Sequence, residues 1–156
     1  MMYYIGDGYS VAKIPKSYSC SIAAAMAKAH YPEIYKQLQL TPALCRAVVP
    51  QSETPQGTFY VVLREPVERF ISTCAMFGLT IEDGLESEDE HFAPQNEFVT
   101  KVATICTSLD ELQSHTGIKF PVVNVGLNKK SIPTDNQLAK IQERYKKDIA
   151  LYKGAS

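Results

Sequence analysis

The sequence has no long apolar run and no strong excess of either charge. No stretch approaches the roughly 20 apolar residues that a membrane-spanning helix needs. The formal net charge is -1 at pH 7, which argues against a protein that binds nucleic acid or an anionic membrane through its overall field. We therefore expect neither of these partners, and any anionic ligand has to be held by a local cluster of donors.

The sequence also lacks closely spaced cysteines. Its cysteines are Cys20, Cys45, Cys74 and Cys106, and none forms a Cys-x-x-Cys pair. Such spacing favours buried, reduced thiols over a disulfide framework or a zinc site. The first seven residues have no basic region followed by an apolar core, so we expect no secretory signal. Together these features predict a cytoplasmic protein without a metal site.

The composition is that of an ordinary globular protein. Hydrophobic residues make up 45% of the 156 residues and charged residues 21%, which argues against disorder. A chain of this length buries about two-thirds of its unfolded surface. Internal repeats, low-complexity tracts and linkers are absent from the sequence. Residues 1–156 are therefore expected to form one domain.

Apolar segments and helical patterns alternate along the chain. Short, mainly apolar segments predict strands at residues 11–14, 43–49 and 120–125, and a continuously apolar segment predicts another at residues 58–63. Helical spacing and capping residues predict helices at residues 19 or 21 to 30, 66–77, 110–115 and 134–152. Residues 82–90 are expected to form a solvated loop, and residues 96–108 fit helix and strand equally well. This order predicts an α/β fold of three layers, α/β/α, with a central parallel sheet.

Two loops of this fold carry groups that bind anions. In a parallel sheet, ligands bind beyond the carboxyl ends of the strands. Residues 15–21, Pro-Lys-Ser-Tyr-Ser-Cys-Ser, join the first strand to a helix. A helix start offers free N–H groups and the positive end of the dipole, which favour phosphate or sulfate. Lys16 adds a mobile charge and the serines add donors. Taken alone, the segment fits a serine N-cap beside a surface lysine equally well.

The second loop follows the strand at residues 58–63. Arg64 lies at the carboxyl end of that strand, where its planar fork suits a phosphate. Ser72 follows two helical turns later and offers a hydroxyl to the same anion. Arg69 is expected to pair with Glu65 or Glu68 at helical spacing. Because both loops lie at the same edge of the predicted sheet, they point to one anion site.

These two segments resemble the cofactor signatures of the PAPS-dependent sulfotransferases, in particular the carbohydrate-type branch; PAPS is 3′-phosphoadenosine 5′-phosphosulfate. Residues 15–21 are similar to the family's 5′-phosphosulfate loop. Residues 64–72, Arg-Glu-Pro-Val-Glu-Arg-Phe-Ile-Ser, are similar to its 3′-phosphate motif. Weaker similarity occurs at residues 91–95, 128–131 and 145–152, in the order that the family has along the chain.

The resemblance implies a fold like that of the P-loop nucleotide hydrolases and an in-line transfer of a sulfuryl group from PAPS to a carbohydrate or small-molecule hydroxyl or amine, releasing PAP. Lys16 would then steady the charge on the leaving phosphate oxygen, and Arg64 and Ser72 would hold the 3′-phosphate. Such a transfer needs positioning and electrostatic stabilisation and no metal. The 5′-phosphate would be cradled by Ser17, Tyr18, Ser19, Cys20 and Ser21.

The acceptor proton needs a base, and His91 is the first candidate. The competing interpretation is that this histidine anchors its loop by hydrogen bonding. Lys129, Lys130 and Ser131 either cover the cofactor phosphates or form an exposed basic turn. The sequence leaves both pairs of alternatives open.

Two alternative functions share the predicted fold. Tyr18 stands where the family usually has Gly or Ala, and Cys20 where Thr or Ser is commoner. These differences favour a non-catalytic module that binds PAP or another nucleotide. A P-loop-like kinase would need the spacing Gly-x-x-x-x-Gly-Lys-Ser/Thr, which the sequence lacks.

Overall fold

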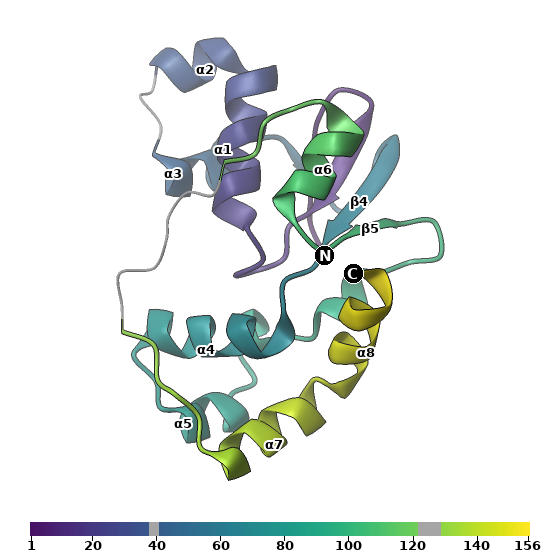
Figure 1. Ribbon diagram of the computed structural model, residues 1–156. Coiled ribbons are helices and arrows are strands. Elements are labelled where there is room, and N and C mark those ends of the chain that lie inside the picture. The colour runs from purple at the N-terminus through teal and green to yellow at the C-terminus, as the bar shows by residue number, and fades with distance from the viewer. Residues whose placement is uncertain (38–40, 122–128) are drawn as a thin grey trace.

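The computed structural model describes residues 1–37, 41–121 and 129–156, and a mixed sheet lies at its centre (Figure 1). In these ranges the sheet has five strands in the order β3-β1-β2-β4-β5. The strands are β1 (Tyr3–Ile5), β2 (Tyr9–Ala12), β3 (Gln51–Ser52), β4 (Thr58–Val62) and β5 (Thr104–Cys106). Strand β4 pairs in parallel with β2 and β5, whereas β1 is antiparallel to β2 and β3. The expectation of an α/β fold with parallel central strands is confirmed, and the antiparallel strands β1 and β3 at one side of the sheet depart from it.

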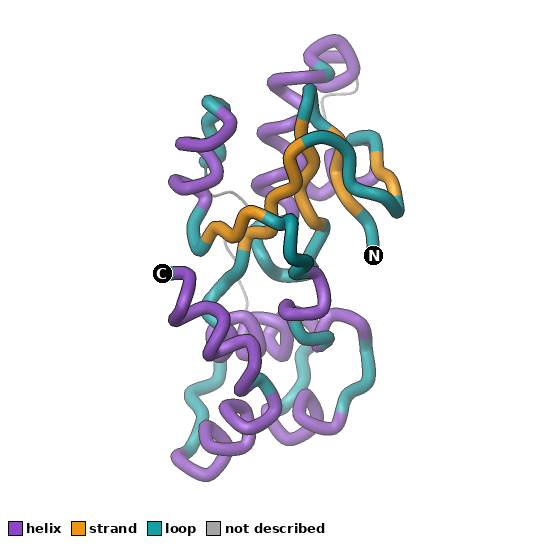
Figure 2. The backbone as a smooth tube through the Cα atoms, turned by 90° about the vertical axis from the view of Figure 1, so that its right-hand side faces the viewer, coloured by secondary structure: helices purple, strands orange, loops and turns teal. Residues whose placement is uncertain are grey.

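Helices surround this sheet. The α-helices are α1 (Ser19–His30), α2 (Pro32–Gln37), α3 (Pro42–Val48), α4 (Pro66–Phe77), α5 (Ile81–Glu86), α6 (Leu109–Thr116), α7 (Asp135–Arg144) and α8 (Lys146–Ala155). Two short 3-10 helices, η1 (Glu90–Phe92) and η2 (Gln95–Phe98), lie between α5 and β5. In Figure 2 the strands occupy the upper half of the molecule, and the lower half is helical. Within the described ranges, no helix is long and apolar enough to cross a membrane.

The side chains of the central strand β4 point alternately to the two faces of the sheet. Both faces are buried, each in a core of its own. Tyr60 and Val62 pack in a core with residues of α1, α3 and α6. Phe59 and Val61 lie in a second core on the opposite face, which η2 and α8 cover through Phe98 and partly buried residues. Helices α4, α5 and α7 share a third core and lie below the sheet in Figure 1, on the side where β4 leads into α4.

The segment at residues 43–49 is a helix, so the strand predicted there is wrong. Thr41 caps α3 by accepting a hydrogen bond from the N–H of Leu44 at 3.3 Å, and Pro42 occupies the first turn. Cys45 is fully buried, whereas Ala43 and Leu44 are exposed. This one-sided burial is helical. A short apolar run does not by itself distinguish a helix from a buried strand.

Part of the acidic segment at residues 82–90 is also helical, although a loop was expected there. Thr80 accepts a hydrogen bond from the N–H of Asp83 at 3.1 Å and caps α5, and the acidic first turn suits the helix dipole. Gly84 lies against α4, where an added Cβ would stand 2.4 Å from the Sγ of Cys74. Glycine here therefore allows the two helices to approach closely.

The remaining predictions agree with the structure to different degrees. Helix α1 and the helix after Pro66 occur as predicted, and Gly117 ends α6 in a left-handed conformation. The C-terminal helix begins after a capping box formed by Thr134 and Gln137, but Tyr145 divides it into α7 and α8. The ambiguous segment at residues 96–108 contains β5. Of the strand predicted at residues 120–125, positions 122–125 lie outside the described residues, and 120 and 121 are not in a strand.

Candidate functional site

The loop between β2 and α1 has an unusual backbone. Lys16 and Tyr18 both adopt the left-handed conformation, with φ of 59° and 61°. This conformation costs a residue with a Cβ about 1–2 kcal/mol. Tyr18 is also the N-cap of α1 and makes no side-chain capping bond. Strained turns that lead into a helix turn backbone N–H groups toward one side and form concavities that bind anions.

Two of the serines predicted to cradle a phosphate hold the loop on the sheet instead. The hydroxyl of Ser17 donates to the carbonyl oxygen of Val62 at 2.6 Å. The hydroxyl of Ser19 shares a hydrogen bond of 2.7 Å with that of Tyr4. Both serines are buried. An anion at this loop would therefore meet backbone N–H groups and cations rather than these two hydroxyls.

Cations from three segments surround the loop. Arg64, directly after β4, donates from Nη1 to the carbonyl oxygen of Lys16 at 3.2 Å. The pKa of Lys16 is lowered, first by burial and then by the charge of Arg64, with smaller contributions from Lys130 and Arg46. In the described ranges the ion pairs join His91 to Asp89 and Lys146 to Glu143, so none of these four cations is paired with a carboxylate. Burial and the neighbouring cations disfavour the charged form of Lys16, and an anion bound beside Lys16 would stabilise that form.

Arg46 of α3 is also a member of this cluster. Burial lowers the pKa of Arg46, but the neighbouring groups of Tyr4 and Cys20 raise it above its ordinary value overall. Its Nε is buried and has no hydrogen-bond partner among the described residues. A buried donor without a partner is rare in folded proteins. The same guanidinium interacts with the side chains of Tyr4 and Cys20, so Arg46 is anchored within the fold and its Nε does not by itself indicate a ligand.

Arg69 has a structural position. It is 2% exposed. Its Nε donates to the carbonyl oxygen of Pro15 at 2.9 Å, its Nη1 to that of Ala93 at 2.9 Å and its Nη2 to that of His91 at 3.1 Å. The expected pairing with Glu65 or Glu68 is therefore wrong. Glu65 instead caps α4. Arg69 ties the loop before α1 to the segment that carries His91.

Gln95 and Asp148 fix the position of Arg64, and neither is among the site residues that the sequence predicts. The side-chain amide of Gln95 accepts from the N–H of Arg64 at 2.9 Å and donates to its carbonyl oxygen at 2.8 Å. The buried carboxylate of Asp148 accepts from the N–H groups of Gln95 and Asn96 at 2.7 and 2.9 Å. A signal for Asp148 existed in the sequence, since it falls on the same helical face as the inward-facing Tyr145 and Tyr152.

The ring of His91 lies away from the Lys16 loop. Its Nδ1 pairs with Asp89 at 2.7 Å, and its ring packs edge-on against Phe77 with 5.1 Å between centroids. Phe77 comes eight residues after Arg69, about 12 Å farther along α4. Only the backbone carbonyl of His91 reaches the loop region, through Arg69. This placement favours the anchoring interpretation of His91 over the catalytic one.

Ser72 lies one turn beyond Arg69 and is buried on α4. Among the described residues no hydrogen bond joins it to Arg64, so the structure brings Lys16 and Arg64 together more directly than Arg64 and Ser72. Lys130 is exposed and close enough to Lys16 to affect its pKa. Of Lys129 and Lys130, it is therefore Lys130 that lies near the Lys16 loop.

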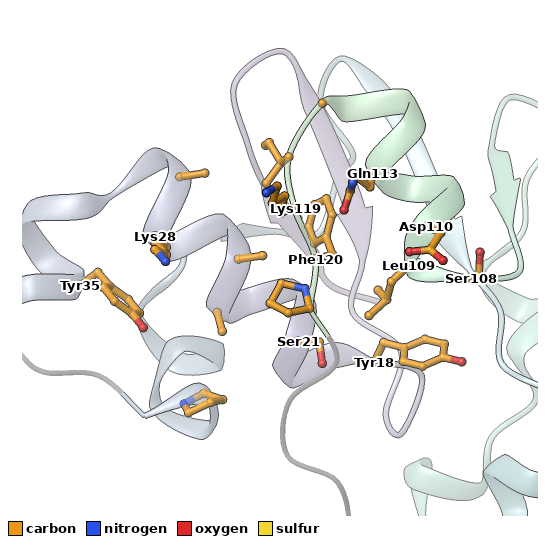
Figure 3. Close-up of a pocket in the computed structure, with 17 residues that line it drawn as sticks. Tyr18, Ser21, Lys28, Tyr35, Ser108, Leu109, Asp110, Gln113, Lys119 and Phe120 are labelled. Atoms are coloured by element: carbon orange, nitrogen blue, oxygen red, sulfur yellow. The ribbon is translucent and has the colours of Figure 1, made fainter.

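A pocket of about 970 Å³ begins at the same loop and runs between α1 and α6 (Figure 3). Tyr18 and Ser21 line one end of it, and Tyr35 of α2 lines the other. Leu109 and Phe120 contribute apolar surface between these ends. The strand-to-helix loop thus borders both the cation cluster and a cavity of the size that small-molecule ligands occupy.

No protein-family model, curated protein or solved structure matches this chain.

Proposed function

We propose that the protein is a PAPS-dependent sulfotransferase, which moves a sulfuryl group from PAPS to an acceptor hydroxyl or amine. The observation that carries the proposal is the meeting of Lys16 and Arg64, from separate loops, beyond β2 and β4, without a carboxylate to neutralise them in the described ranges. PAPS carries anionic groups at two separate positions, the 5′-phosphosulfate and the 3′-phosphate. Two adjacent basic loops suit a ligand with two separate anionic groups better than they suit a ligand with a single phosphate.

The roles follow from the positions of the residues. Lys16 and the start of α1 face the 5′-phosphosulfate, and the first turn of α1 carries no acidic residue to repel it. Arg64, which Gln95 holds by its backbone, binds the 3′-phosphate with its guanidinium fork. Lys130 adds a further positive charge beside Lys16.

In the reaction, the acceptor oxygen or nitrogen forms a bond to sulfur while the bond from sulfur to the 5′-phosphate oxygen breaks. PAP leaves with the electron pair of that bond, and the acceptor proton passes to a base. The negative charge that grows on the leaving oxygen lies at Lys16 and at the helix start, where both stabilise it. Lys16 is therefore the residue whose loss should affect the transfer step itself.

A second candidate function is a module that binds PAP without catalysing transfer. The specific observation in its favour is the ring of His91, which is engaged by Asp89 and Phe77 rather than directed to the loop. Tyr18 adds to it, because a large left-handed residue stands at the helix start. Binding and transfer therefore need separate tests.

The binding test is calorimetric titration of the protein with PAP, AMP and ATP with magnesium. PAP should bind at least about tenfold more tightly than AMP, since its 3′-phosphate adds charge-assisted hydrogen bonds worth about 1.5–3 kcal/mol. Arg64→Ala should remove that preference, and Lys153→Ala, an exposed lysine of α8, should leave it unchanged. Absence of PAP binding, or preference for ATP with magnesium, would overturn the proposal.

The transfer test follows PAP release from PAPS in the presence of pooled alcohols, phenols and amines. A sulfotransferase should release PAP at a rate that depends on the acceptor, and Lys16→Ala should lower that rate far more than it weakens PAP binding. Tight PAP binding without acceptor-dependent release would instead identify the non-catalytic module.

A further inference from the structure

The pocket between α1 and α6 has a shape that suits an elongated ligand. On α1 its lining runs from Ser21 to Ala29, which spans about 12 Å along the helix axis. Tyr18 closes the end beside the Lys16 loop, and Tyr35 stands at the far end (Figure 3). The volume of about 970 Å³ is several times that of a single sugar or nucleobase ring and near the upper limit for small-molecule pockets.

The walls of the pocket are largely apolar. Small side chains of α1, Ala24, Ala25 and Ala29, leave the space, while the larger Ile22 and Met26 of the same helix are buried in the core against the sheet. The remaining apolar lining residues are Pro42, Leu109, Ile118, Phe120 and Pro121. Tyr18 and Tyr35 are half-buried, so part of each ring is covered by the core and part is open to the pocket.

Polar side chains lie mainly at the outer edge of this pocket. Lys28, Asp110, Gln113 and Lys119 line it and are all exposed. A carbohydrate has hydroxyls around its whole surface and would leave many of them facing apolar walls, each at a cost of about 1–3 kcal/mol. A body of alkyl or aryl groups with a polar end meets no such cost.

We infer that this pocket binds the acceptor of the sulfuryl transfer, an alcohol, phenol or amine with an elongated, largely apolar body and its reactive group at the Tyr18 and Ser21 end. The inference rests on the proposed function for the role of the ligand, but not for its binding. It narrows the acceptor from carbohydrates and small molecules in general to apolar ones. Tyr18, which differs from the small residue of the family loop, becomes a wall of the acceptor site.

The chain contains no tryptophan, so Tyr35→Trp introduces a single fluorescent reporter at the far end of the pocket. The probes are 4-alkylphenols with chains of one to six carbons. Each added CH₂ that enters the pocket should tighten binding about fourfold, as expected for about 0.8 kcal/mol per buried CH₂. Affinity that does not depend on chain length would overturn the inference.

Filling the pocket provides the matched test. Ala24→Leu places a larger side chain in the cavity and should weaken binding of the longest phenol at least tenfold. Ala139→Leu makes the same change at an exposed site of α7 and should not. If Ala24→Leu does not fold, as judged by its thermal unfolding, the exposed pocket residue Ala29 takes its place as Ala29→Leu. Equal binding by the filled and control variants would show that the phenols bind elsewhere.

Saturating PAP separates this inference from the proposed function. Phenol binding that persists with PAP bound supports an acceptor pocket beside the cofactor site, whereas displacement by PAP would mean that the nucleotide occupies the pocket and would overturn the inference. If the protein binds phenols but has no affinity for PAP, the pocket is an apolar binding site, but its role in sulfuryl transfer is refuted. PAP binding with no phenol binding would refute the pocket inference alone.

Discussion

Arg64 and Arg69 come from one short segment, yet the structure uses them in opposite ways. Arg69 is buried, and each of its three donor nitrogens reaches a backbone carbonyl oxygen, those of Pro15, His91 and Ala93. Arg64 is partly exposed and lies beside Lys16, and among the described residues its guanidinium has the carbonyl oxygen of Lys16 as its one hydrogen-bond partner. One arginine is satisfied within the fold, and the other stands in a group of cations.

This difference separates structure from function within a single motif. A buried arginine with every guanidinium nitrogen bonded to a backbone carbonyl oxygen is engaged within the fold and is not open to a ligand. Cations that face one another without a carboxylate in the described ranges add nothing to the stability of the free protein and gain from a bound anion. Within residues 64–72, Arg69 therefore serves folding stability and Arg64 is available to a ligand. Unfolding measurements test the first role, and binding measurements test the second.

The largest change in the free energy of unfolding is expected for Arg69→Met. The substitution leaves three buried carbonyl oxygens without donors and should lower the free energy of unfolding by about 3–5 kcal/mol. Urea denaturation followed by circular dichroism measures it. Arg64→Met is the matched control and should lower that free energy by less than about 1 kcal/mol. Similar losses for both variants would break the comparison.

A smaller effect is expected for Asp148→Asn, which tests the support behind Arg64. The amide retains one acceptor but turns an NH₂ group toward the N–H groups that the carboxylate now accepts from. We expect a loss of about 2 kcal/mol in the free energy of unfolding and weaker PAP binding, because the segment that holds Arg64 through Gln95 shifts. Asp7→Asn, at an exposed turn, should change neither quantity. Unchanged PAP binding in Asp148→Asn would show that Arg64 does not depend on this support.

The smallest effect on folding, and the one with the opposite sign, is expected for Lys16→Met. The pKa of Lys16 is lowered by burial and by Arg64, so the unfolded state binds this proton more strongly than the folded state. Charged Lys16 therefore costs stability at neutral pH, and Lys16→Met should be more stable than the natural sequence there by less than about 1 kcal/mol.

The sign of the pH dependence gives the control for this prediction. Between the lowered pKa of Lys16 in the folded state and the ordinary lysine value, the folded state releases this proton while the unfolded state still holds it. The loss of folding stability that charged Lys16 causes therefore disappears as the pH rises through this range. The stability difference between Lys16→Met and the natural sequence should therefore shrink toward about pH 10. Added sulfate should stabilise the natural sequence more than the variant in thermal unfolding. A variant that is less stable at pH 7 would contradict this account.

Local patterns predicted some elements well. The stop at Gly117, the capping residue Thr134 and the continuous apolar segment of β4 each act over a few neighbouring residues, so the sequence carries their signals directly. The segment 43–49 was mistaken for a strand, because a short apolar run fits either state and packing on α1 decided the outcome. Helix α5 was not predicted because its acidic residues and Gly84 are typical of a loop, whereas the contact of Gly84 with α4 exists only in the folded chain.

For the site, the sequence by itself determined that Lys16 and Arg64 follow the buried strands β2 and β4, because apolar runs and strand ends are local features. The tertiary structure decided which polar groups are used up inside the fold: the hydroxyls of Ser17 and Ser19 and the guanidinium of Arg69. It also decided where the His91 ring points and that small residues of α1 face α6 across a pocket. Apart from the bond between His91 and Asp89, these outcomes join residues far apart in the chain, and hydrogen bonds and cavities of that kind exist only after the segments have packed.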